Sequence, residues 1–93
     1  MGSLTPESRP LRVDDVVYFP HDGEVLLHHL DSGQYYRLNA VAGEVWELCE
    51  GTLSIADIAD RIVEAFEADA EQVVKDVNSL IQELHDEECV VLA

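Results

Sequence analysis

Histidine, cysteine and carboxylate side chains are the groups of this 93-residue chain that could carry chemistry, as metal ligands, proton carriers or nucleophiles. The four histidines are His21, His28, His29 and His85. His28 and His29 are adjacent in a segment with the composition of a strand, where neighbouring side chains point to opposite faces. The pair therefore cannot hold one metal ion or share one proton from the same side.

Neither cysteine fits a metal site or a catalytic nucleophile. Cys49 and Cys89 lie far apart, without the Cys-x-x-Cys or Cys/His spacing of zinc ligands. Cys49 falls among apolar positions of an expected helix, which favours a small buried side chain. A Gly-x-Ser-x-Gly elbow, a phosphate-binding loop and a His-Glu-x-x-His motif are absent from the sequence. We therefore predict no enzymatic activity, no metal and no cofactor, and the cysteine usage fits a reducing cytoplasm.

The charge of the chain is strongly acidic and unevenly distributed. Twenty Asp and Glu residues stand against five Lys and Arg, a formal net charge of -15, and residues 40–93 carry fourteen of these acids and two of these bases. Such a surface repels the phosphates of nucleic acids and anionic lipid headgroups. No apolar run approaches the roughly 18 residues of a membrane span. We therefore predict neither a nucleic-acid nor a membrane partner.

Three strand-like segments come first among the elements that must position any site. β-branched, aromatic and other apolar residues fill residues 16–20, 24–31 and 34–38. Turn signals of the Asp-Gly and Asp-Ser-Gly type separate them. The pattern predicts a three-stranded antiparallel meander, which is too small to be stable unless something covers one face.

Three helix-like segments follow the strands, at residues 40–50, 55–66 and 70–86. Asn39, a Ser54–Asp57 capping box and Asp69 mark their starts. The order predicts an α+β fold, winged helix-turn-helix-like, in which a three-stranded antiparallel sheet is followed by three helices.

The domain organisation predicted from this order is simple. Residues 1–11 form a flexible lead-in and residues 12–93 form a single domain. A winged helix suggests DNA binding, but the third helix has one lysine among several acids, so the charge argues against that function.

The third predicted strand, residues 34–38, is the most informative segment. Side-chain alternation puts Gln34, Tyr36 and Leu38 on one face and Tyr35 and Arg37 on the other. In a simple meander its outer edge is unpaired, and it has no proline or lysine to blunt it. Two interpretations stay open: a peptide adds to this edge as a further strand, or the edge is covered by the chain's own tail or by a second copy.

Several motifs of the chain resemble the PqqD-like family, the peptide-recognition domains of ribosomal peptide natural-product pathways. The resemblance covers about residues 13–92. Its entry motif appears as Leu30, Asp31, Gly33, Tyr36, Leu38 and Asn39. Further matches are Gly43, the run Val-Trp-Glu-Leu-Cys-Glu-Gly at 45–51, the residues Leu53, Ile55, Ile58 and Ala59, and the helix motif at 76–84.

The resemblance implies a non-catalytic domain that holds the leader of a precursor peptide as an added strand against the third strand, beside the third helix. It implies that the leader is presented to a modifying enzyme such as a leader peptidase, a cyclase or a radical-SAM maturase. Strand contacts then fall on Gln34, Tyr35, Tyr36, Arg37 and Leu38. The groove wall falls on Val73, Asp76, Val77, Leu80, Ile81 and Leu84.

Two departures from the family pattern bear on these expectations. Many relatives have Gly-Leu after the third helix, where this chain has Glu88 and Cys89, so the helix end is expected to differ. A Pro-Glu-Arg-Gly-like segment of the quinone-cofactor branch is absent, which makes the chain more similar to recognition proteins of lasso-peptide or radical-SAM pathways. The alternative function is a structural module whose open edge is closed by homodimerisation, so we expect a monomer or a weak homodimer.

Overall fold

The computed structural model of the protein describes residues 4–93. It has an α+β fold in which a three-stranded antiparallel sheet is followed by three helices, as predicted. The elements in chain order are β1 (Pro10–Arg12), β2 (Val16–His21), β3 (Glu24–His29), β4 (Tyr35–Leu38), α1 (Ala40–Glu47), α2 (Ile55–Phe66), α3 (Ala70–Asp86) and β5 (Val90–Leu92).

The meander has the order β2-β3-β4, and its turns follow the predicted chemistry. Asp22 and Gly23 both have positive φ values, 51° and 79°, which is the conformation of a two-residue type I′ hairpin turn. Gly33 also has a positive φ, 78°, in the turn before β4. The predicted strands are therefore confirmed, with small differences at their ends.

The three helices begin at the predicted caps. The side chains of Asn39 and Asp69 accept hydrogen bonds from the N–H groups of Ala42 and Gln72. Ser54 and Asp57 form the reciprocal capping box. The predicted helix starts are therefore confirmed. They could be predicted because these caps are local signals that do not depend on the tertiary structure.

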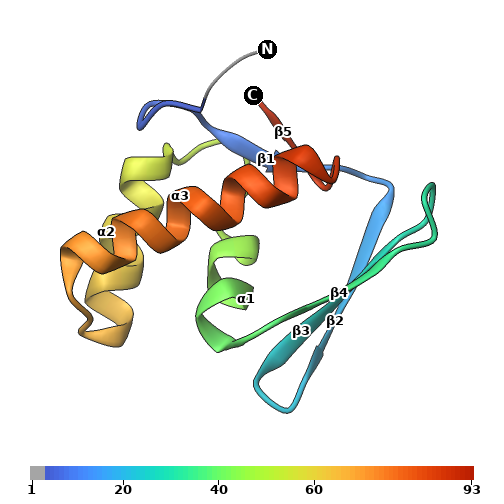
Figure 1. Ribbon diagram of the computed structural model, residues 1–93, viewed down its shortest axis with the longest axis horizontal. Coiled ribbons are helices and arrows are strands. Elements are labelled where there is room, and N and C mark those ends of the chain that lie inside the picture. Colours follow the sequence, from blue (N-terminus) through green and yellow to red (C-terminus); the bar gives the residue numbers. More distant parts are fainter. Residues whose placement is uncertain (1–3) are drawn as a thin grey trace.

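The helices lie on one side of the sheet, and α1 lies between the sheet and the pair α2 and α3 (Figure 1). Buried residues of α1, including Val45 and Trp46, join buried residues of the other elements in one core. Gly43 lets α1 approach the sheet closely, since a Cβ atom there would lie 2.7 Å from Val25 Cγ2. The start of α1, which directly follows β4, is thereby fixed against β3.

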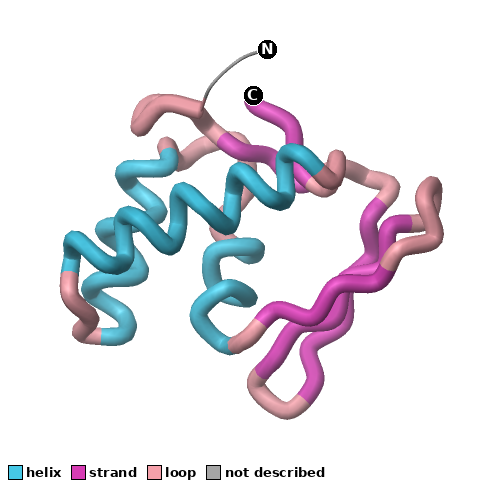
Figure 2. Tube along the Cα trace, viewed as in Figure 1, coloured by secondary structure: helices cyan, strands magenta, loops and turns pink. Residues whose placement is uncertain are grey.

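A second, two-stranded sheet of β1 and β5 was not predicted (Figure 2). β1 pairs with β5 in antiparallel fashion, with Leu11 opposite Val91. The C-terminal tail therefore covers β1 and leaves β4 uncovered. The predicted boundary after residue 11 falls inside β1, and residues 1–3 of the predicted lead-in lie outside the described residues.

The segment before β1 also contacts the helices. The carbonyl groups of Ser8 and Pro6 accept hydrogen bonds from the N–H groups of Ile55 and Ala56, in the first turn of α2. Free N–H groups at a helix start need such acceptors. Mobility of the lead-in stays a prediction.

The end of α3 keeps a glycine-like conformation without a glycine. The helix ends at Asp86, and Glu88 has a φ of 61°, in the left-handed region. This region is costly for residues with a Cβ atom and is the conformation in which glycine ends many helices. The Gly-to-Glu departure therefore changes the residue at this position while the left-handed turn is retained.

Candidate functional site

The outer edge of β4 presents backbone groups without partners in the described part of the chain. The His29 N–H donates to the Gln34 carbonyl, and the register continues with Leu27 opposite Tyr36. Because hydrogen-bonded pairs alternate in an antiparallel ladder, the N–H and C=O groups of Tyr36 and Leu38 point toward β3. Those of Tyr35 and Arg37 point away from it, to the open edge.

The opposite edge of the same sheet, formed by β2, differs from the β4 edge in one protective residue. By the same alternation, Val17, Phe19 and His21 of β2 point their backbone groups toward β3, and Pro20 occupies an outward position. Proline has no N–H to offer an added strand, which is a common way to protect a sheet edge. The β4 edge has no such protection, so it is the better of the two edges for strand addition.

Two adjoining hollows run beside the β4 edge, and we call them together the β4–α3 groove. The larger one, of about 520 Å³, is the β4 hollow, lined by Tyr35, Tyr36, Arg37, Leu38, Leu80, Glu83, Leu84, Asp86 and Glu87. The smaller one, of about 280 Å³, is the α1 hollow, lined by Asn39, Val41, Ala42, Val45, Asp76, Val77 and Leu80. Leu80 of α3 belongs to both. An open edge beside an apolar hollow is the geometry of strand-addition sites.

Tyr36 connects the two sides of the groove. Its ring is half-buried, and its hydroxyl donates a 2.8 Å hydrogen bond to Glu87 Oε1 at the end of α3. The pKa of Tyr36 is raised to about 12, with desolvation as the largest cause and this hydrogen bond to a carboxylate as the next. The neutral phenol is thus favoured in the folded protein.

We expect Tyr36→Phe to lower the free energy of unfolding by about 1 kcal/mol at neutral pH, because one hydrogen bond to a charged acceptor is lost. Since the folded-state pKa is raised above its usual 10, the stabilisation is complete below pH 10 and is lost as the pH rises to about 12. Urea unfolding measures the first effect. An ultraviolet titration of tyrosinate tests the second: a component near pH 12 that persists in Tyr36→Phe would contradict it.

His29 fixes the turn before β4 to the end of α3. Its side chain is buried, Nδ1 accepts from the Ser32 N–H at 3.4 Å, and Nε2 lies 3.1 Å from the Glu88 carbonyl. The contact at Nδ1 assigns the proton to Nε2, which then donates to Glu88. His28 points to the other face, as predicted, and its ring stacks on Tyr35 with centroids 4.1 Å apart.

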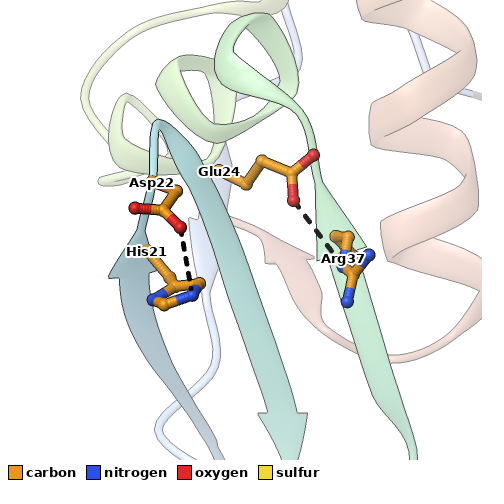
Figure 3. Close-up of polar contacts among 4 residues, drawn as sticks. All are labelled: His21, Asp22, Glu24 and Arg37. Atoms are coloured by element: carbon orange, nitrogen blue, oxygen red, sulfur yellow. Dashed lines mark ion pairs between the residues drawn. The ribbon is translucent and has the colours of Figure 1, made fainter.

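Charges around the hairpin tip lie mainly on the outer face of the sheet (Figure 3). Arg37 Nε is 3.7 Å from Glu24 Oε1, and His21 Nε2 is 3.4 Å from Asp22 Oδ2. Arg37 and Asp76 form no ion pair within residues 4–93. Asp76 instead accepts a hydrogen bond from Gln72 Nε2 on the same helix.

Most of the residues predicted to bind a peptide are brought together in this region. Tyr36, Leu38, Val77, Leu80 and Leu84 contribute to the lining with Tyr35, Arg37 and Asp76, and Gln34 lies directly before β4. Val73 and Ile81 are buried in the core and line neither hollow. Their assignment to a peptide site therefore has no support in this geometry.

Several lining residues were missed by the sequence analysis. Val41 lies in the helix-like segment 40–50, and its side chain is 37% exposed at the α1 hollow. The sequence signal that could have assigned Val41 to the site is its position shortly after β4. Glu83 and Glu87 were not assigned to the site, although they follow Leu80 at helical spacing and so share its face.

The cysteines are structural. Both thiols are free and buried. Burial raises the pKa of Cys49 to about 12, against a smaller opposing effect of Arg12, and raises that of Cys89 to about 11. Both are therefore protonated at neutral pH and weak as nucleophiles. Within residues 4–93, no three His, Cys, Asp or Glu side chains gather as a metal site, and no helix is long and apolar enough to cross a membrane.

Comparisons with known proteins give the following matches. The family model of coenzyme PQQ synthesis protein D (PqqD) matches residues 24–90. TbiB1 in complex with the TbiA(beta) leader peptide superposes with a TM-score of 0.76 at 31% identity, covering 86% of this chain and 93% of that one. A lasso peptide synthetase B1 complexed with the leader peptide gives 0.77 at 19% identity, covering 89% and 98%. No curated protein matches the chain.

Proposed function

Because this chain belongs to the PqqD family, we propose that it is a non-catalytic peptide-binding protein that captures the leader of a ribosomally synthesised precursor peptide. The solved relative TbiB1, 31% identical, holds a leader peptide. The bound leader is then presented to the enzyme that modifies the precursor. The single observation that carries this proposal is the unprotected β4 edge beside the β4–α3 groove.

The leader adds to β4 as a fourth strand. The outward N–H and C=O groups of Tyr35 and Arg37 offer it main-chain hydrogen bonds that do not depend on its sequence. Alternate leader side chains point into the groove, where Leu38 and Leu80 and the α1 hollow offer apolar contacts. Affinity and selectivity therefore come from different parts of the site.

The modifying enzyme, such as a leader peptidase, a cyclase or a radical-SAM maturase, meets a surface next to the bound leader. The outer face of the sheet fits this role because the helices cover the other face (Figure 1). Phe19 and Tyr35 are exposed there at 52% and 62%, and Leu30 nearby at 56%. A docked enzyme would thus lie next to the docked leader, with Tyr35 at the boundary of the two surfaces.

Calorimetry with synthetic leaders of short precursor peptides, to be sought in the genomic neighbourhood of the gene, tests the proposal. We expect micromolar or tighter binding, on the order of 8 kcal/mol. Amide resonances of residues 34–38 should shift in NMR spectra of the complex. Absence of heat together with unchanged amide resonances would contradict the proposal.

The alternative function, a module that closes its β4 edge with a second copy, makes a different prediction. Two β4 edges would pair across a two-fold axis. Sedimentation at two protein concentrations separates the two functions, since a structural dimer shows a mass that rises with concentration and is unchanged by added leader, whereas a leader-binding monomer keeps its mass at both concentrations.

A further inference from the structure

We infer that the leader segment in the β4–α3 groove is cationic, with a Lys or Arg four residues away from an apolar anchor. The inference rests on the proposed function and specifies the chemistry of the peptide. It follows from the charges that line the groove and from their position relative to its apolar end.

Acidic side chains line the α3 side of the groove. Asp76, Glu83 and Glu87 flank Leu80 at intervals of three or four residues, so all four share one face of the helix. Asp86 lines the same hollow. Against these four acids, Arg37 is the basic residue of the lining, and its nearest carboxylate is that of Glu24. A peptide in the groove therefore meets a net negative wall.

Three of the four acids accept hydrogen bonds, but none of the four is neutralised. Asp76 and Asp86 accept from the amide side chains of Gln72 and Gln82, and Glu87 accepts from Tyr36. None of the four takes part in an ion pair within residues 4–93. Their charge is thus left for a ligand that approaches the β4 edge.

The position of these acids is also unfavourable for the helix itself. The C-terminal end of an α-helix carries a partial negative charge and favours cations. The end of α1 follows this rule, because Arg12 Nη1 donates to the carbonyls of Trp46 and Glu47. The end of α3 does not: Glu83, Asp86 and Glu87 are there, and the basic residue of its last turn, His85, lines a hollow on the other side with His29. A cationic ligand would offset this repulsion.

The opposite end of the groove is mainly apolar, with Asn39 and Asp76 as its polar lining residues, and it supplies the anchor position. Val41, Ala42, Val45, Val77 and Leu80 line the α1 hollow beside the end of β4. The β4 hollow with Glu83 and Glu87 lies beside Tyr35 and Tyr36, at the start of the strand. Four residues of an added strand span about 13 Å and bring the side chain back to the same face. This spacing separates an apolar side chain in the first hollow from a basic one in the second.

Selection of random twelve-residue displayed peptides on the wild-type protein tests the inference. We expect enriched peptides that carry Lys or Arg four residues from a large apolar residue. On the double variant Glu83→Gln and Glu87→Gln, this preference for basic residues should disappear while the apolar preference persists. The Gln side chain at position 87 can still accept from Tyr36, so the fold is retained.

Calorimetry with an enriched peptide measures the effect. We expect the double variant to bind about tenfold more weakly at low salt, with a smaller difference at high salt. Asp60→Asn with Glu64→Gln, two exposed acids of α2, is the matched control with the same change in net charge and should bind as the wild type.

The outcomes separate the inference from the function on which it rests. Peptides that bind the groove without a basic preference, or equal affinities for wild type and Glu83→Gln/Glu87→Gln, would overturn the cationic leader and leave leader capture intact. Peptides whose binding is unaffected by Leu80→Asn would bind elsewhere and would count against both.

Discussion

Leu80→Asn is expected to weaken leader binding at least thirtyfold, about 2 kcal/mol, and to leave the fold intact. Leu80 is the one residue shared by both hollows of the β4–α3 groove, and it is only partly buried. Its replacement removes apolar contact from the middle of the groove. Asparagine is neutral, so the charge of the groove does not change and the effect reports packing alone.

Two neighbouring positions of α3 provide the controls. Val74→Asn lies on the exposed side of the helix, where the side chain is 45% exposed, and should change neither binding nor stability by more than about 0.5 kcal/mol. Val77→Asn buries an amide at a position that is 2% exposed, and should lower the free energy of unfolding by about 3 kcal/mol. That is a large part of the stability of a domain of this size.

For the three variants, chemical denaturation measures the free energy of unfolding and calorimetry measures leader binding. If Leu80→Asn unfolds the protein, its side chain belongs to the core and not to the groove wall. If it folds and binds the leader as the wild type does, the leader does not occupy the groove.

Arg37→Pro should weaken leader binding at least tenfold while Arg37→Ala changes it by less than about threefold. Both variants remove the same charged side chain. Only proline also removes the outward N–H and places its ring at the open edge of β4. The β3–β4 ladder is retained because the N–H of residue 37 does not point toward β3.

Calorimetry of both Arg37 variants with the leader gives the comparison. Equal losses for proline and alanine would mean that the guanidinium, not the backbone edge, recognises the peptide. Wild-type affinity in Arg37→Pro would exclude strand addition at β4. The circular dichroism spectrum of each variant checks that the sheet is preserved.

Much of this fold is predictable from the sequence because its signals are local. Asn39, Ser54 and Asp69 are capping residues, and Asp22-Gly23 is a turn signal, so each acts through neighbours a few residues away. The pairing of β1 with β5 joins opposite ends of the chain. Three-residue strands that contact each other over such a distance leave no periodic pattern to read.

The groove could be predicted only in part, and there is a physical reason why the rest could not. The apolar stripe of α3 identifies the residues that face away from solvent, but the stripe faces the core and the groove together. Val73 and Ile81 pack in the core, whereas Leu80 reaches the groove, and only the placement of α3 against β4 separates them. Acids such as Glu83 look the same in sequence whether they face solvent or a binding site.

Pro20 limits how copies of this protein can assemble. If both sheet edges accepted strands, the β4 edge of one molecule could add to the β2 edge of the next, and such head-to-tail contacts propagate into fibres. With Pro20 at an outward position of β2, the β2-β3-β4 sheet has one edge open to strand addition, β4, and its β2 edge is a poor acceptor. Self-association by strand pairing at β4 then stops at two molecules. The domain can therefore keep an edge that accepts an added strand, even at high concentration, without forming fibres.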